Sequence, residues 1–458
     1  MRRLSWRQAS VLALLASVVI VNTHVRGDGN GYYAWLASSV VDHDLDFRNQ
    51  YQHADPLFRD YVIDAAGQAR PDKVTTTGHV INQWAIGPAV LWAPWFIAAH
   101  AFVVVTGADP QDGYAPIYLR AVATGSLVYA FLAVALGISA ARKLGVSANA
   151  ARFAAVLIWG ASALLMYAYM LPFHVHTSAA FTSALFFWYW ISRDRPLRRS
   201  EWAVWGACYG LMGMSYHVDL VFGIVTLHAV KTAWPTRRWQ IAGDALVFGV
   251  TALAVGLPQW IGKAIVYGSA LATGYRDDFF WWSPRLWATL FSTNHGAVLW
   301  TPLIAIGVIG LALLRRDARI RWLSAATLLF YFTIASYQNW HGLSSFGNRF
   351  FISLSLPILI GVAALVDRAW RGGRRAVVAT ALAGAMLVAW NAGLAFQWVS
   401  KMIPNRGGVN VGLVVFQQTQ VPRLMVSYGY RYFTDRASLI TEIERRDQIE
   451  QSRHFNAR

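Results

Sequence analysis

Apolar runs long enough to cross a lipid bilayer recur along almost the whole chain, and they limit the possible folds more than any other feature. A transmembrane helix needs roughly 20 apolar residues. The predicted spans are Ala9–Val21, Trp84–Val105, Ile117–Ala140, Ala154–Leu171, Phe173–Ile191, Trp202–Val230, Ile241–Ile261, Ala297–Leu314, Trp322–Ser336, Phe350–Val366 and Val377–Phe396. Because Trp202–Val230 is long enough for a tight pair, the sequence predicts an all-α polytopic membrane protein with about 11 to 13 transmembrane helices.

The charged residues are few and are confined to short segments between these runs. Only 14% of the residues are charged, whereas about a quarter is usual in soluble proteins. The net charge of +17 comes largely from Arg and Lys clusters at 193–199, 231–238, 315–321 and 368–375. Basic residues in short loops mark the cytoplasmic side of a membrane. The positive charge therefore indicates topology and gives no reason to expect nucleic acid as a partner.

One connection conflicts with this topology. Arg142, Lys143 and Arg152 lie between the third and fourth predicted spans, where strict alternation from an external first loop predicts an external connection. Either a segment between 84 and 140 does not fully cross the membrane, or the charge rule fails at this connection. The later basic clusters agree with one another and place 262–295 and 337–349 outside, on the side of the first loop.

The N-terminal run has no small-residue cleavage site after it, so we expect an uncleaved first span with its N-terminus inside. Residues 26–83 then form a first external loop, periplasmic in a bacterium, with helices on the membrane surface at about 32–41 and 56–63. We expect a transmembrane domain over 1–396 and a polar, external C-terminal tail over 397–458. Cys208 is the only cysteine, which excludes a disulfide within the chain and a cysteine-based metal site.

Asp28 is the leading candidate for a catalytic residue. It lies in the glycine-rich segment Gly27-Asp28-Gly29-Asn30-Gly31, just after the first span, where an acid would lie at the mouth of the bundle. An Asp in front of a helix can also serve only as its N-cap. The two roles are compatible, because a helix N-terminus favours the ionised carboxylate that a general base requires.

The other external segments supply cations and hydrogen-bonding groups. An acid in one loop can take a proton from an acceptor hydroxyl, while cations from other loops stabilise the charge on a departing phosphate. The candidates for substrate binding are Arg349, His341, Lys263, His295, Asn294, Tyr33, Arg276 and His79. Arg349 begins a span, so a simple contact with lipid headgroups is the alternative role for it.

Two other groups of residues have the composition of metal sites. Asp42, Asp44 and Asp46 fit a solvated helix end better than a metal site, and His174 and His176 fit polar core positions better than zinc ligands, since no third ligand accompanies them. A divalent metal cofactor is left open, and no other cofactor is expected.

Four segments resemble the GT-C integral membrane glycosyltransferases, in particular bacterial relatives of the protein O-mannosyltransferases and of the lipid A aminoarabinose transferase. The segments are Gly27-Asp28-Gly29-Asn30-Gly31-Tyr32-Tyr33, Ile86-Gly87-Pro88-Ala89-Val90-Leu91-Trp92-Ala93-Pro94, Ser292-Thr293-Asn294-His295-Gly296 with Trp300-Thr301-Pro302, and Ser345-Phe346-Gly347-Asn348-Arg349-Phe350. The resemblance implies a GT-C bundle in the bacterial inner membrane with its active site facing the periplasm. It also implies that a sugar is transferred, with inversion, from a polyprenyl-phosphate carrier to a lipid, glycan or protein acceptor.

In this family the base is an acid of the first external loop, which the resemblance places on Asp28. The chain lacks the adjacent Asp-Glu pair of the best-known members. A secondary transporter and a glycan polymerase or ligase are the alternatives. Few charges within spans and weak internal symmetry argue against the transporter, and the early position of the acid argues against the polymerase.

Overall fold

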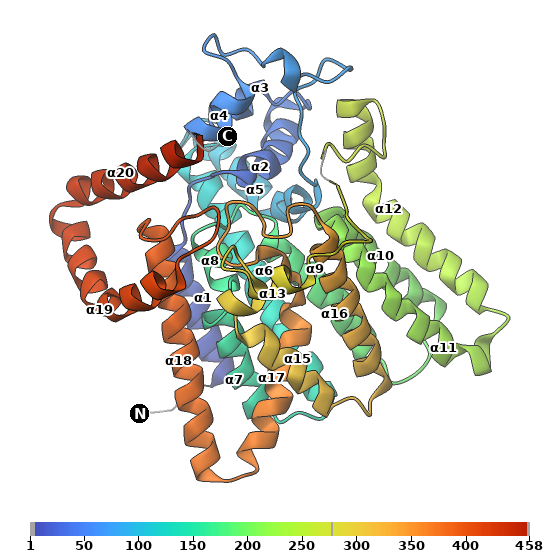
Figure 1. Ribbon diagram of the computed structural model, residues 1–458. Coiled ribbons are helices and arrows are strands. Elements are labelled where there is room, and N and C mark those ends of the chain that lie inside the picture. Colours follow the sequence, from blue (N-terminus) through green and yellow to red (C-terminus); the bar gives the residue numbers. More distant parts are fainter. Residues whose placement is uncertain (1–4, 276–277, 456–458) are drawn as a thin grey trace.

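The computed structural model describes residues 5–275 and 278–455, and within them the chain is helical, with three isolated β-bridges and no sheet. Figure 1 shows a bundle of upright helices covered at one end by short helices and loops. The helices are α1 (Trp6–Ile20), α2 (Asp28–Ala37), η1 (Ser38–Asp42), α3 (Arg48–Gln52), α4 (Pro56–Val62), η2 (Pro71–Lys73), α5 (Gly87–Thr106), α6 (Pro116–Lys143), α7 (Ala148–Gly160), α8 (Leu164–Tyr169), α9 (His176–Ile191), α10 (Arg199–Ser215), η3 (His217–Val225), α11 (Thr226–Arg237), α12 (Ile241–Tyr267), α13 (Leu286–Phe291), α14 (Ala297–Trp300), α15 (Leu303–Leu313), α16 (Ala318–Ser336), η4 (Arg349–Leu354), α17 (Ser355–Trp370), α18 (Arg374–Val399), α19 (Val411–Thr434) and α20 (Arg436–Phe455).

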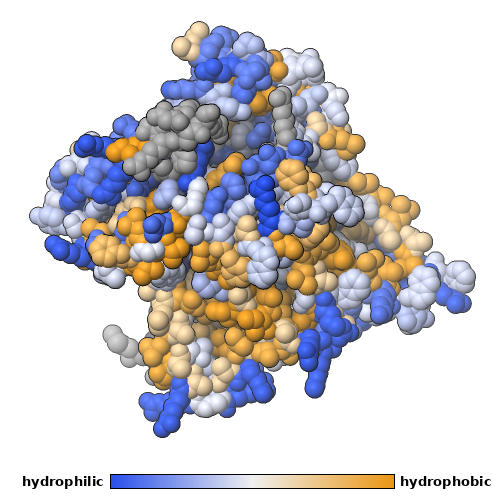
Figure 2. Space-filling view, viewed as in Figure 1, coloured by the Kyte–Doolittle hydropathy of each residue, from blue (hydrophilic) through white to orange (hydrophobic). Residues whose placement is uncertain are grey.

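The all-α polytopic fold is confirmed. Five helical segments in the described part of the chain are long and apolar enough to cross a membrane: 87–106, 116–143, 241–267, 349–370 and 374–399. The other predicted spans are shorter or interrupted. The run predicted at Ala154–Leu171, for example, is divided into α7 and α8 by a break after Gly160. On the face seen in Figure 2, hydrophobic residues form a broad band across the bundle, and hydrophilic residues gather above and below it.

The basic loops all lie at one end of the bundle, as the sequence predicts. Lys143 and Arg319 both pair with Asp194, and Arg199 and Arg237 both pair with Asp244. These ion pairs connect the loops after α6, α9, α11 and α15. Asp367 near the end of α17 accepts a hydrogen bond from the Ser147 backbone, which adds the α17–α18 turn to the same end.

The course of α5 explains the conflicting charges at 142–152. Just before this helix, the carbonyl of Trp84 accepts a hydrogen bond from the indole of Trp35 on α2. Just after it, the carbonyl of Gly113 accepts one from Tyr33, also on α2. The residues that flank α5 therefore both contact α2, and α6 carries the chain to the basic end. This arrangement favours the first of the two alternatives, in which a segment between 84 and 140 does not fully cross, although α5 is long and apolar enough to do so.

The first external loop contains the two predicted helices, at Asp28–Ala37 and Pro56–Val62. All residues of α2 after Asp28 are buried, so this helix is enclosed by the structure and has no face free for the membrane surface. Tyr33 lies at the centre of this packing, edge-on to Phe96, Tyr114 and Phe173. An aromatic cluster of this kind fixes the position of α2 and of the acid at its start.

The central helix α17 carries η4, and with it Arg349, at its outer end. Its residues Ser355–Ala364 are all buried. It crosses α15 very closely, since a Cβ added to Gly361 would lie 1.8 Å from the carbonyl oxygen of Gly307. On the other side, Ser353 of η4 donates a hydrogen bond to Asp219 of η3. These contacts fix the backbone on which Arg349 stands.

Candidate functional site

Asp28 and Arg349, which come from opposite parts of the chain, form an ion pair. The distance between Arg349 Nη1 and Asp28 Oδ2 is 2.7 Å. One third of the Asp28 side chain is exposed (33%), compared with 13% for Arg349. Asp28 begins α2, whereas Arg349 begins η4 directly after Asn348. The pair therefore lies where the loop 26–83 meets the Arg349 end of the central helix.

The turn before Asp28 is held by an acid that we did not single out from the sequence. Oδ1 of Asp55 accepts hydrogen bonds from the Gly27 backbone (2.9 Å) and from the Asn30 side chain (2.7 Å). Gly27 has a φ of +53°, a region that side chains other than glycine rarely adopt. The N-cap position of α2 belongs to Gly27, and Asp28 is the first helical residue. The interpretation of Asp28 as an N-cap is therefore wrong.

Burial raises the pKa of the Asp28 carboxyl, but the charges of Arg349 and His174 and the hydrogen bonds from Arg349 and Trp84 outweigh this effect and lower the pKa below its usual value. Asp28 is thus ionised at neutral pH. It combines partial exposure with a fixed orientation, which a base needs if it is to reach a substrate proton.

The guanidinium of Arg349 has a buried donor that the contact with Asp28 does not use. Within the described part of the chain, its Nε atom is buried and has no hydrogen-bond partner. A guanidinium has five N–H donors in one plane and can bind two anionic groups along different edges. An oxyanion that reached Nε would satisfy this donor while Nη1 holds Asp28.

Aromatic and imidazole rings line the pair on its inner side. The ring of Tyr167 lies 5.8 Å from that of His174 and 4.6 Å from that of His176, and Tyr216 lies 5.9 Å from His176. His174 and His176 are buried polar residues of this wall. No group of three or more His, Cys, Asp or Glu side chains in the described residues is arranged to hold a metal ion. Tyr167 and Tyr216 stand in apolar segments, and no sequence pattern distinguishes them from core residues.

His295 and His341 lie beside Arg349 in the other external loops. Burial is the main cause that lowers the pKa of His295 to about 3, and the charges of His341 and Arg349 act in the same direction. Burial also lowers the pKa of His341, again with contributions from nearby arginines that include Arg349. Asn294 precedes His295, and its buried Oδ1 atom has no hydrogen-bond partner among the described residues. The structure thus brings three predicted ligands, Arg349, His295 and His341, close together.

Two further predicted ligands have structural contacts. Lys263 of α12 is buried, and its Nζ donates to the carbonyl oxygens of Asn82 (2.8 Å) and Thr273 (3.4 Å). The Tyr33 hydroxyl donates to the Gly113 carbonyl. These bonds connect loops of the external end.

The remaining residues are placed as follows. His79 lies in the turn after η2, with its Nδ1 atom 3.0 Å from the Thr77 hydroxyl. Arg276 lies outside the described residues. Asp42 and Asp44 accept hydrogen bonds from neighbouring side chains, and Asp46 pairs with Arg48, so each of these acids has a local partner.

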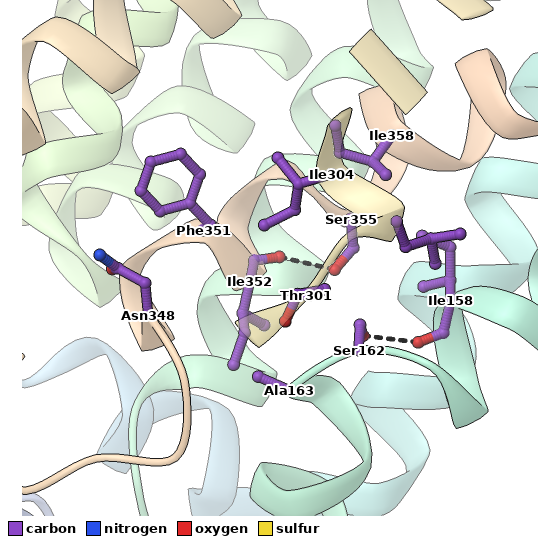
Figure 3. A pocket seen from close by; sticks show the side chains of 11 residues that line it. Ile158, Ser162, Ala163, Thr301, Ile304, Asn348, Phe351, Ile352, Ser355 and Ile358 are labelled. Atoms are coloured by element: carbon purple, nitrogen blue, oxygen red, sulfur yellow. Dashed lines mark hydrogen bonds between the residues drawn. The ribbon is translucent and has the colours of Figure 1, made fainter. Parts of the chain in front are cut away.

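A small cavity of about 20 Å³ lies next to η4 (Figure 3). Asn348, Thr301, Ser162 and Ser355 contribute its polar groups, and the two serine hydroxyls bind backbone carbonyls. Ligand pockets usually measure about 300 to 1,000 Å³. The cavity is too small for a sugar and holds no acid or base among its lining residues, so we do not include it in the site.

No protein-family model matches the chain, and no curated protein matches it either. Among solved structures, the chain is similar to the crystal structure of ArnT from Cupriavidus metallidurans bound to undecaprenyl phosphate, with a TM-score of 0.47 and 12% sequence identity. The match covers 91% of this chain and 72% of that chain.

Proposed function

We propose that this protein is an inverting, GT-C type glycosyltransferase that moves a sugar from a polyprenyl-phosphate carrier to a lipid, glycan or protein acceptor at the outer face of a bacterial inner membrane. The observation that carries the proposal is the contact between Asp28 and Arg349. It joins an ionised, partly exposed acid to a buried guanidinium with a free donor, at the outer end of a membrane bundle.

In the proposed reaction, the acceptor hydroxyl oxygen attacks the anomeric carbon as Asp28 takes the hydroxyl proton. The bond between that carbon and the phosphate oxygen breaks, and its electron pair stays on the phosphate. Because the new bond forms opposite the breaking one, the configuration is inverted. Phosphate is a good leaving group, so one base and one source of positive charge suffice. Arg349 supplies that charge, with His341 and His295 beside it.

The contact between Asp28 and Arg349 limits how the two roles can be combined. The base and the departing phosphate must lie on opposite sides of the anomeric carbon, whereas the side chains of Asp28 and Arg349 are in contact. We propose that Arg349 orients Asp28 through Nη1 and receives the phosphate through Nε, with the sugar beside the ion pair. If the sugar instead enters between the two residues, donor binding breaks the ion pair.

Contacts between the four segments that resemble GT-C enzymes also support the proposal. The first holds Asp28 and the last holds Arg349. The indole of Trp300 in the third donates to the Thr293 carbonyl and packs edge-on against Phe346 of the last. The second segment opens α5, which packs against α2.

A direct test compares cells with and without the protein by mass spectrometry of their surface glycans and glycolipids, and then assays the purified protein in nanodiscs. We expect one modification to disappear from the cells. The purified protein should transfer the matching sugar from a synthetic polyprenyl-phosphate donor. Unchanged glycans together with passage of a solute across vesicle membranes by the purified protein would favour a transporter and overturn the proposal.

A further inference from the structure

Helix α19 in the C-terminal tail lies against the outer part of the spanning helix α18. Gln418 of α19 donates to the carbonyl of Trp390 (3.1 Å), and Gln397 of α18 donates to the carbonyl of Val414 (3.3 Å). Gly393 permits this close approach, since a Cβ there would lie 1.9 Å from Gln418 Oε1. Trp390 precedes the end of α18 at Val399 by roughly 13 Å of helix. Part of α19 therefore lies below the outer end of a membrane-crossing helix.

A second face of α19 is apolar and uncovered. Val414 and Val421 are buried, while Val411, Val415, Val426 and Phe433 are exposed by 42%, 48%, 75% and 88%. At 100° per residue, these four exposed side chains fall within an arc of roughly 60°, away from the buried pair. The exposed stripe therefore runs along nearly the whole helix.

The surface next to this stripe is the lipid-facing side of α18. Val378, Leu382 and Met386 of α18 are exposed by 50%, 62% and 73% on a helix that is long and apolar enough to cross the membrane. In Figure 1, α19 and α20 project sideways from the outer end of α18. In Figure 2, this lobe is largely hydrophilic at its upper edge and carries hydrophobic residues lower down, towards the apolar band.

We propose that α19 is an interfacial helix whose stripe of Val411, Val415, Val426 and Phe433 lies in the lipid surface at the Asp28 end of the bundle. Exposed apolar patches of this extent on a folded protein mark a partner or a membrane. Here the exposed surface of α18 adjoins the stripe, which identifies the partner as lipid. Amphipathic helices of this kind bury their apolar face at the boundary between headgroups and acyl chains. The tail then holds the external loops at a defined height above the bilayer.

The test places a spin label at single cysteines in the full-length protein, reconstituted in phosphatidylethanolamine–phosphatidylglycerol vesicles. Cys208 is buried and is first replaced by serine. The labelled variants are Val426→Cys and Phe433→Cys. The matched control is Gln420→Cys, an exposed polar position roughly 120° or more around the same helix from the stripe. We expect labels at 426 and 433 to collide readily with oxygen and poorly with a water-soluble nickel chelate, and the label at 420 to show the reverse.

Two results would overturn the proposal. Nickel accessibility at 426 and 433 equal to that at 420 would place the stripe in water. Immobile labels shielded from both reagents would place it against protein, such as a second copy of the chain. If Cys208→Ser lowers the melting temperature, the wild-type background serves instead, with labelling of Cys208 measured and subtracted. The result does not depend on any transferase activity.

Discussion

The guanidinium of Arg349 lies 2.7 Å from the carboxylate of Asp28, and this contact makes the protonation state of one residue depend on the other. Burial alone raises the pKa of Asp28, and the charge of Arg349 is the largest of the effects that lower it. If Asp28 is the base and Arg349 binds the phosphate, as proposed, this effect on the pKa of Asp28 couples the two halves of the reaction. The predictions below separate these halves.

Asp28→Asn should abolish most sugar transfer while leaving the fold intact. The amide keeps the shape of the side chain but cannot accept a proton, and general base catalysis contributes at least about 100-fold. Transfer from a synthetic polyprenyl-phosphate sugar in nanodiscs measures the loss, and the melting temperature in detergent checks the fold. A well-folded Asp28→Asn protein with near-normal turnover would remove Asp28 from the mechanism and shift attention to other acids of the external loops.

Arg349→Gln should move the acid limb of the pH–rate profile to higher pH. Without the guanidinium charge, burial dominates and the pKa of Asp28 rises, so protonation inactivates the base at a pH where the wild type is active. Arg349→Lys keeps a positive charge near Asp28, so its pH–rate profile should lie closer to that of the wild type than the profile of Arg349→Gln does. Its affinity for the donor should remain low, because an ammonium cannot present two edges to two anions. The profile of kcat against pH and the donor KM are measured for both variants. An unshifted acid limb in Arg349→Gln would show that the base is another residue.

Asp55 is expected to position Asp28 without taking part in proton transfer. Asp55→Ala removes the acceptor for Gly27 and Asn30 and should lower turnover on the order of 10- to 100-fold, because misplacing a catalytic group is costly. Asp55→Asn keeps a side-chain oxygen and should recover most of the activity, with the pH profile unchanged. Asp60→Ala, at a more exposed acid of the same loop, is the matched control. Equal losses in Asp55→Ala and Asp55→Asn would instead indicate that the charge of Asp55 matters.

Sequence reasoning succeeded where residue type alone carried the information. The apolar runs predicted a helical membrane protein, and the chemistry of Asp28 and Arg349 marked both before their contact was known. It left the topology around α5 open, because hydropathy does not indicate on which side of the membrane the segments that flank a helix lie. It did not identify Asp55, since one Asp before a proline has the composition of an ordinary helix start. Tyr33 illustrates a third limit, because only the fold shows that its hydroxyl binds a backbone carbonyl.

Lys263 is expected to support the fold more than it binds substrate. Its ammonium is buried and bonded to the carbonyls of Asn82 and Thr273. Lys263→Met keeps a long, unbranched side chain but removes the donor to these two carbonyls. The melting temperature should therefore fall by several degrees. The donor KM of the folded fraction should stay close to that of the wild type. A large rise in donor KM without loss of stability would return Lys263 to the phosphate site.

Stability should decrease as the pH falls from about 6.5 towards 4, and His295 should account for part of the slope. Burial lowers the pKa of His295 to about 3 in the folded protein, whereas an unfolded histidine titrates near 6.5. Between these values the unfolded chain binds a proton that the folded one does not, so unfolding becomes easier by roughly 1 kcal/mol per pH unit. Above pH 6.5 both states are neutral and the effect disappears.

His295 has a φ of +58°, a conformation that asparagine tolerates, so His295→Asn is the suitable variant. The melting temperatures of the wild type and of His295→Asn are measured from pH 4 to 8. The difference between them should be smaller at pH 4 than at pH 8. Parallel curves over the whole range would show that the ring of His295 is accessible to protons in the folded state.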